Sequence, residues 1–215
     1  MINFSIRSES EADYREVEEV TREAFWNLYI EGCDEHYLVH IMRDHSDFIR
    51  ELSFVAVKDG KIIGSIMYTR SYLIDESGAR LETITFGPLC VHPEYQRLGV
   101  GTALIDHTKR LAVSRGDNAI IILGHPKNYL KHGFKVSKDI NISDPEGKYH
   151  LGLMALELKK GILTDGIKRK FYTSDIFYQM DSQKIAEFDT GFTPKKKEYR
   201  YTQYEYDVSC RAIIE

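Results

Sequence analysis

Two glycines separated by one residue, Gly99 and Gly101, stand where a helix is expected to begin, shortly after a strand that ends at Val91. The first amides of a helix have no acceptor within the helix, and the helix dipole adds positive partial charge there. Glycines remove the Cβ atoms that would keep an anion away from those amides. Arg97 could add a charge-assisted hydrogen bond. The pattern therefore predicts an anion site sized for a phosphate or pyrophosphate.

Two familiar nucleotide-binding patterns do not fit these glycines. A Walker loop needs the sequence GxxxxGK[ST], and the run from Gly99 to Thr102 has no such lysine. A Rossmann fingerprint needs a third glycine where Leu104 stands, and it needs a strand–helix–strand unit nearer the start of the chain. A helix start that contains glycine and binds nothing stays the alternative for the two glycines alone.

Pro88 lies inside the strand expected over residues 81–91, although proline cannot donate to a ladder of hydrogen bonds. A sheet tolerates this where a strand bulges or parts from its neighbour. If the strand splays from the apolar run Ala119–Leu123, free backbone groups of residues 89–91 face a cleft beside the anion site. A ligand with a pyrophosphate at one end and an amide-bearing arm could fill that cleft. Coenzyme A has that shape.

The elements that must position these residues are predicted from hydrophobic period and turn residues. Ser10 is a plausible N-cap, Asp59-Gly60 favours a hairpin, and Gly116 suits the end of the third helix. A strand, a helix and a strand in succession predict one right-handed parallel crossover. The expected strands cover residues 2–7, 53–58, 61–73, 81–91, 119–123, 134–137 and 150–158, and the expected helices 11–25, 34–48 (interrupted near 45–46), 100–114 and 127–132.

The run Gln96-x-x-Gly99-x-Gly101 resembles the pyrophosphate motif of the GNAT superfamily of acetyl-coenzyme A-dependent N-acetyltransferases. The segments 89–93 and 129–134 fall where that family places its second strand motif and its Tyr-x-x-x-Gly-Phe element. The resemblance implies an α/β fold of the GNAT acyl-CoA N-acyltransferase type, with a mixed, splayed β-sheet flanked by helices. It implies an N-acetyltransferase domain over residues 1–158 and a C-terminal extension, 159–215, packed on it, as in one bacterial branch.

The resemblance also assigns roles to single residues. Tyr129 aligns with the tyrosine that many relatives use to protonate the departing thiolate. The amides of residues 97–102 would hold the pyrophosphate, and backbone groups of residues 89–91 would pair with the pantetheine arm. The expected cofactor-binding set is Leu89, Cys90, Val91, Gln96, Arg97, Leu98, Gly99, Val100, Gly101, Thr102 and Asn128, with acetyl-CoA as cosubstrate and no metal.

Several residues are candidates for the general base, and the sequence does not decide among them. Many relatives carry a glutamate where this chain has Thr85, and Glu82 points to the opposite face of a regular strand unless a bulge resets the register. His92 and His125 are further candidates, each more consistent with a structural role, and a water relay is an equal alternative. Cys90 has no legible histidine–acid partner, so packing explains it better than nucleophilic catalysis.

The composition limits the kinds of partner that the protein is expected to bind. The 215 residues carry a net charge of −4, which argues against a general nucleic-acid binder, and three widely spaced cysteines give no metal knuckle. Without an apolar run long enough to span a bilayer, we expect a cytoplasmic protein with no membrane partner.

The acceptor is expected to be an amine on a small molecule or on a peptide. Ten acidic residues against two basic ones between Glu9 and Glu35 indicate either a solvated helix face or a field that attracts a cationic acceptor. The predicted reaction is direct attack of a primary amine on acetyl-CoA. A non-catalytic acyl-CoA sensor or interaction module is the alternative, and a homodimer is possible because the extension is rich in tyrosine.

Overall fold

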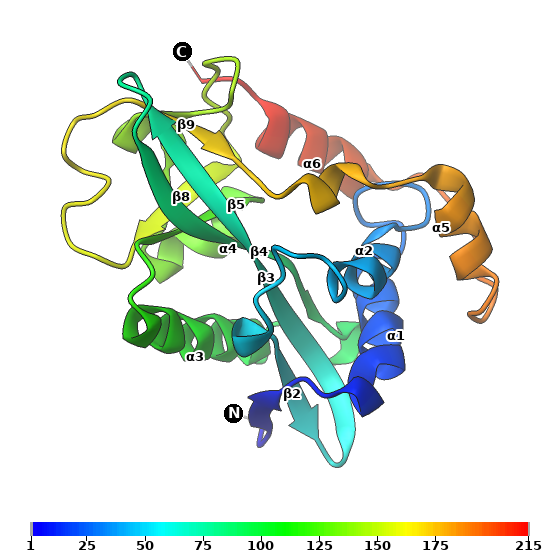
Figure 1. Cartoon of the computed structure of the whole chain (residues 1–215). Helices are drawn as coiled ribbons and strands as arrows, with labels where there is room; N and C mark the ends of the chain where they lie inside the picture. The colour runs from blue at the N-terminus through cyan, green and yellow to red at the C-terminus, as the bar shows by residue number, and fades with distance from the viewer. Residues whose placement is uncertain (1, 215) are drawn as a thin grey trace. The chain divides into compact units, whose positions relative to one another are not determined.

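The computed structural model describes residues 2–214 (Figure 1). No helix in this range is long and apolar enough to cross a membrane. The helices are α1 (Tyr14–Phe25), α2 (Glu35–Met42), α3 (Val100–Arg115), α4 (Pro126–Tyr129), α5 (Ser182–Asp189) and α6 (Tyr201–Arg211). The strands are β1 (Ser5–Ser8), β2 (Phe54–Lys58), β3 (Lys61–Asp75), β4 (Arg80–Val91), β5 (Ala119–Leu123), β6 (Lys135–Val136), β7 (Ile142–Ser143), β8 (Leu153–Glu157) and β9 (Arg169–Tyr172).

The chain folds into two compact units that share its long elements. The first unit holds the residues up to Tyr68 together with Gly87–Thr108 and Asp175–Gln203. The second unit holds Thr69–Phe86, Lys109–Ser174 and the residues from Tyr204 onward. Strands β3 and β4 and helix α3 each begin in one unit and continue into the other.

In the first unit, β1, β2 and the first half of β3 form an antiparallel meander. The β2–β3 turn is the predicted Asp59-Gly60 hairpin, and both residues have positive φ. Helices α1 and α2 lie side by side (Figure 1). Apolar side chains of α1 pack with β2 and the end of β4, and those of α2 pack with Met67 of β3, so each helix buries an apolar face.

The boundaries of the first two helices differ from the prediction. A 3-10 turn, Glu11–Asp13, precedes α1, and the Asp13 carboxylate accepts hydrogen bonds from N and Oγ of Ser10, at 2.8 and 2.7 Å. Ser10, which the sequence predicted as the N-cap of this helix, is therefore bonded to the 3-10 turn that precedes α1. Helix α2 ends at Met42 rather than Phe48, because the chain turns there instead of continuing the helix.

In the second unit, β4 and β5 pair in parallel at Ile84 and Ile120, as the predicted crossover requires. Strand β8 pairs antiparallel with β5 and with β6, and β9 pairs with β3 and β7. The buried faces of these strands form one apolar cluster that includes Ile121, Leu153 and Ala155. The sheet is mixed, with helices around it, as the sequence predicted.

The residues after 158 contribute to both units. Residues 159–174 and those from Tyr204 onward belong to the second unit, while Asp175–Gln203, including α5, belongs to the first. In the first unit, Arg22 of α1 holds the Asp189 carboxylate at 2.6 Å, and the Trp26 indole donates to the carbonyl of Lys196 at 3.0 Å. A domain boundary at residue 158 stays a prediction.

Candidate acetyl-CoA site

The glycine loop belongs to the first unit. After β4 the chain makes a 3-10 turn, Pro93–Tyr95, and α3 begins at Val100. Gly99 has φ +91° and open space where a side chain would lie, so glycine is needed there for its backbone conformation. A Cβ added at Gly101 would meet only a methyl group of Val91, at 3.6 Å. The first turn of α3 therefore presents its amides with little side-chain cover, as an anion site requires.

Gln96 and Arg97 shape this loop in different ways. The Gln96 amide donates to the carbonyl of Val91 at 3.1 Å, which ties the loop to the end of β4. Arg97 has φ +60°, a left-handed conformation that costs energy for a residue with a side chain, and it is exposed. Backbone strain of this kind is common at ligand sites, and it orients successive amides of the loop.

The side chains of β4 alternate between two environments near this loop. The Cys90 thiol is buried between Thr21 Oγ1, at 3.4 Å, and Ser65 Oγ, at 3.2 Å, whereas Val91 points toward Gly101. Burial raises the pKa of the Cys90 thiol. A thiol held protonated and enclosed is a poor nucleophile, so the packing role predicted for Cys90 is confirmed.

Tyr129 ends α4 in the second unit, between two aromatic rings. The ring centroids of Phe86 and Phe134 lie 5.7 and 5.9 Å from that of Tyr129. A Cβ at Gly124 would lie 2.7 Å from Tyr129 Cε2, so only glycine lets the ring settle against the backbone there. Burial raises the pKa of Tyr129 to about 12, so the phenol is protonated at neutral pH. Asn128, the preceding residue, is exposed.

Helix α6 influences Tyr129 electrostatically and is connected to it through two glycines. The charge states of Cys210 and Tyr206, both on α6, add to the rise in the Tyr129 pKa. A Cβ at Gly152 would lie 2.7 Å from Cys210 Cα, and the Gly152 carbonyl accepts the amide of Gly124 at 2.9 Å. Backbone contacts thus lead from α6 through Gly152 and Gly124 to the ring of Tyr129. Sequence reasoning missed this arrangement, because the residues involved are far apart in the chain.

The base candidates occupy different environments. Glu82 is exposed and forms an ion pair with Arg80 at 2.6 Å. Thr85 is buried, and its hydroxyl has no hydrogen-bond partner among residues 2–214. His92 and His125 each accept a backbone N–H two residues further along through Nδ1, at 3.4 and 3.2 Å, so each caps a short helical turn. These contacts account for both histidines structurally.

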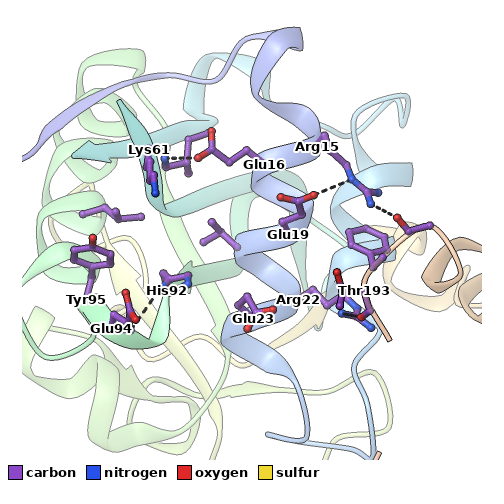
Figure 2. A pocket seen from close by; sticks show the side chains of 15 residues that line it. Arg15, Glu16, Glu19, Arg22, Glu23, Lys61, His92, Glu94, Tyr95 and Thr193 are labelled. Atoms are coloured by element: carbon purple, nitrogen blue, oxygen red, sulfur yellow. Dashed lines mark hydrogen bonds and ion pairs between the residues drawn. The ribbon is translucent and has the colours of Figure 1, made fainter. Parts of the chain in front are cut away.

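A groove with a volume of about 560 Å³ lies in the first unit, along α1. The start of β3, the turn after β4 and residues 191–193 complete its walls. Figure 2 shows Glu19, Glu23 and Lys61 around it. Glu19 pairs with Arg15 at 3.2 Å and Glu23 pairs with Lys195 at 2.6 Å.

Much of the acidic bias of the N-terminal segment is neutralised within the first unit. Arg43 is buried with Glu9 and Glu18, at 2.8 and 3.0 Å, and Arg7 holds Asp13 at 2.6 Å. These carboxylates therefore contribute little to a long-range field. The acids that remain exposed to solvent on α1 are those at the rim of the groove, including Glu19 and Glu23.

A buried cysteine, histidine and aspartate also lie in line in the first unit. Cys33 Sγ is 3.3 Å from His36 Nδ1, and His36 Nε2 is 3.2 Å from Asp189 Oδ1. Burial raises the pKa of the Cys33 thiol and lowers the pKa of His36 to about 4. Neither group is charged at neutral pH, so the arrangement connects α2 to α5 and does not activate a nucleophile.

Two other groups of acidic residues in the first unit have unusual surroundings. Burial and the neighbouring Asp34 raise the pKa of Glu35 above its ordinary value. One atom each from His45, Asp47 and Asp175 lie within 4.8 Å of one another, a spacing that could hold a metal ion. His45 Nε2 lies 2.9 Å from the Asp175 carboxylate, so these two side chains already interact directly with each other.

The model of the acetyltransferase (GNAT) family matches residues 18–134, more than half of the chain. This chain belongs to that family. It is therefore an acetyl-CoA-dependent N-acetyltransferase, as the motif around Gly99 and Gly101 predicted. The chain continues for about 80 residues beyond the matched part.

Individual relatives agree with this assignment. The uncharacterized N-acetyltransferase YjhQ of Escherichia coli is 31% identical over 137 residues, which cover 62% of this chain and 70% of YjhQ. A crystal structure of the GNAT family N-acetyltransferase YhbS of Escherichia coli in complex with CoA superposes with a TM-score of 0.69 at 22% identity, covering 84% of this chain and 95% of YhbS. A family member from Brucella melitensis in complex with acetyl-CoA gives a TM-score of 0.63 at 22% identity, covering 81% and 98%. The structural matches show that the fold is shared.

Proposed function

We propose that this N-acetyltransferase moves the acetyl group of acetyl-CoA to a primary amine by direct attack in a ternary complex. The observation that carries the proposal is the glycine loop at the start of α3. It combines a left-handed Gly99, an unobstructed Gly101 and exposed residues 97–99. The two similar structures that contain CoA or acetyl-CoA support the same ligand.

In this proposal the backbone amides of residues 97–102 bind the pyrophosphate. The helix dipole and the Arg97 guanidinium add positive charge for the same anion. The bond from Gln96 to Val91 keeps the loop in one conformation, so less conformational entropy is lost on binding. Backbone groups of Leu89, Cys90 and Val91 are proposed to pair with the amides of the pantetheine arm.

Tyr129 is proposed as the group that assists the departing thiolate. Its phenol is protonated at neutral pH because burial raises its pKa to about 12. A free thiol has a pKa of about 8.5, so complete transfer of the phenol proton to a thiolate would be uphill. Tyr129 therefore acts mainly as a hydrogen-bond donor that stabilises negative charge on sulfur as the C–S bond breaks.

The acceptor class we favour is a cationic amine, either a small molecule or the amine of a peptide. Carboxylates outnumber cationic side chains in the lining of the groove, and Glu19 and Glu23 stay exposed although each has one ion-pair partner, so the groove favours a cation by a small excess of negative charge. Raising the salt concentration should weaken the apparent affinity of a cationic acceptor. A salt-independent affinity would remove charge attraction as the basis of recognition.

Calorimetric titration of acetyl-CoA into the full chain tests the cofactor site, with ATP and dephospho-CoA as controls. Tight binding of acetyl-CoA and much weaker binding of ATP are expected, because the loop lacks the Walker lysine. Thiol release should then be followed with spermidine, an aminoglycoside and a peptide with a free N-terminus. Failure of acetyl-CoA to bind at high protein concentration would overturn the proposal.

A further inference from the structure

In the first unit, the ring of Phe177 lies against Gly87, a position of β4 that has no side chain. A Cβ added at Gly87 would lie 3.7 Å from Phe177 Cε1 and 4.0 Å from Cζ. Apart from residues 86 and 88, no other atom of the described chain, residues 2–214, would lie within 4 Å of that Cβ. These are ordinary van der Waals distances. The space between the Gly87 backbone and the ring therefore admits one methyl group in contact with both.

The turn that carries Phe177 is anchored next to α2. Ile176 is 2% exposed and packs in the apolar cluster that α2 forms with Met67 of β3. Phe177, which is half-buried, packs against the same cluster. At the start of the turn, the Asp175 carboxylate lies 2.9 Å from His45 Nε2. Two anchors directly before Phe177 thus limit how far its ring can move away from β4.

Strand β4 departs from regular alternation between Gly87 and Cys90. The Cys90 thiol contacts Ser65 Oγ of β3 at 3.2 Å. Met67, two residues further along β3, belongs to the cluster against which Phe177 packs. Residues two apart on a strand share a face, so positions 87 and 90 face the same side, whereas residues three apart face opposite sides of a regular strand. Such an irregularity leaves backbone groups outside the ladder, as the proline between the two positions predicted.

The acetyl group of the proposed cofactor would lie beside Gly87. The glycine loop follows β4, so a pantetheine arm that leaves the pyrophosphate runs back along the strand, from Val91 to Leu89. In this arm the thioester sulfur lies only two methylene groups beyond the last amide. One residue of a strand spans about 3.3 Å. A sulfur two methylene groups beyond Leu89 therefore lies within about two residues of it, and the acetyl group that it carries comes next to Gly87.

We propose that Phe177 determines which acyl group the enzyme accepts, because its ring closes the space above Gly87 to groups longer than acetyl. The inference rests on the acetyl transfer proposed above and adds the residue that selects the acyl donor. The acetyl methyl fills the space for one methyl group, whereas a butyryl chain requires the anchored ring to move. One methylene group in an apolar site changes selectivity about 10–200-fold. Residue 177 lies outside the part of the chain, residues 18–134, that the family model matches.

Calorimetric titration of the full chain with acetyl-CoA, butyryl-CoA and CoA tests this selection without an acceptor. Wild-type protein should bind butyryl-CoA at least tenfold more weakly than acetyl-CoA. Phe177→Ala should reduce this difference to threefold or less, and Phe177→Leu should give an intermediate ratio. The ratio of kcat/KM for the two esters, followed by thiol release with the same three amines, should shift in the same direction. A ratio does not depend on the fraction of protein that is folded.

Gly87→Ala is the reciprocal change. The added Cβ fits without a clash, so the melting temperature should stay within a few degrees of wild type. Its methyl group would take the space of the acetyl methyl, so the Kd for acetyl-CoA should rise about tenfold, while the Kd for CoA, which has no acyl group, should change less than twofold. Tyr178→Ala is the matched control on the same turn, because Tyr178 is 79% exposed, and it should leave the ratio unchanged.

The outcomes separate this inference from the proposed function. Equal affinity of the wild type for acetyl-CoA and butyryl-CoA would overturn the role of Phe177 alone, as would a Phe177→Ala variant with the wild-type ratio. Failure of both CoA and acetyl-CoA to bind would overturn the cofactor site and the inference with it. A wild-type protein that binds acetyl-CoA but is inactive with all three amines would count against the acceptor class, and the ratio of the dissociation constants would still decide on Phe177.

Discussion

The glycine loop of the first unit and the surroundings of Tyr129 in the second are built in opposite ways. The loop is made by seven consecutive residues, Gln96–Thr102, in which glycine suits the left-handed conformation at position 99 and only Arg97 adopts such a conformation at a cost. The Tyr129 site is made by Phe86, Gly152 and Cys210, which come from strands, loops and a helix far apart in the chain. A local anion site can thus be recognised from a motif, whereas the environment that sets a pKa depends on long-range packing.

The largest effect is expected from a change at Tyr129 itself. Tyr129→Phe keeps the ring between Phe86 and Phe134 but removes the proton donor. Turnover should fall about 10²–10³-fold, a typical loss for a positioned acid. The Kd for acetyl-CoA, measured by calorimetry, should change less than twofold. A variant with normal turnover would show that the enclosed phenol has only a packing role.

The second prediction concerns His36, which contacts Asp189 of α5 from α2. Its folded-state pKa of about 4 lies below the ordinary value of 6.5, so the unfolded chain binds the proton more readily. The stability from neutral, buried His36 is present above pH 6.5 and is lost as the pH falls toward 4. The shift corresponds to about 3 kcal/mol at most. Urea denaturation between pH 7 and pH 4 should show this loss, and His36→Gln should show less of it.

The substitution Gly152→Ala tests the contacts between α6 and the backbone at Gly152. The added Cβ would lie 2.7 Å from Cys210 Cα and 2.8 Å from the Cys210 carbonyl oxygen, so the backbone must shift. We expect a loss of about 1–3 kcal/mol in the free energy of unfolding, as for other overpacked sites. The pKa of the Tyr129 phenol, followed by NMR with labelled tyrosine, should move toward 10. An unchanged pKa would show that α6 contributes nothing to the site.

Gly101→Ala is the matching change in the glycine loop. Its Cβ would meet only Val91 at an ordinary contact distance, so the melting temperature should stay within a few degrees of wild type. The methyl group would nevertheless stand among the amides that bind the pyrophosphate. The Kd for acetyl-CoA should rise about tenfold, or about 1.4 kcal/mol. If affinity is retained, the loop is a structural helix start.

Glu82→Gln should have the smallest effect. Because Glu82 is exposed and paired with Arg80, kcat/KM should stay within twofold of wild type. Glu82 was the carboxylate that the sequence offered as a base. A loss of a hundredfold or more would restore it to that role.

The sequence predicted most of what local patterns can determine. The β2–β3 hairpin follows from Asp59-Gly60, the end of α3 from Gly116, and the parallel strand β5 from its unbroken apolar run. The end of α2 was predicted six residues too late, since the apolar residues Phe48 and Ile49 continue the pattern although the helix does not. Their burial comes from the chain folding back, which no local period reveals.

For the candidate site, too, local motifs could be predicted from the sequence and long-range contacts could not. Gly99, Gly101 and Tyr129 were found from spacing and from the resemblance. The role of Cys210 escaped notice, since no pattern connects it with a tyrosine 81 positions earlier.

The segment that follows α6 is joined to residues 149–152 by the main chain alone. The amide of Leu151 donates to the carbonyl of Ala212 at 2.8 Å, and the amide of Ile214 donates to the carbonyl of Tyr149 at 2.7 Å. Main-chain bonds of this kind do not depend on which side chains are present, so single substitutions in residues 212–214 should leave this junction in place. Removal of these residues would leave the same backbone groups without partners, and we expect it to loosen the loop that contains Gly152.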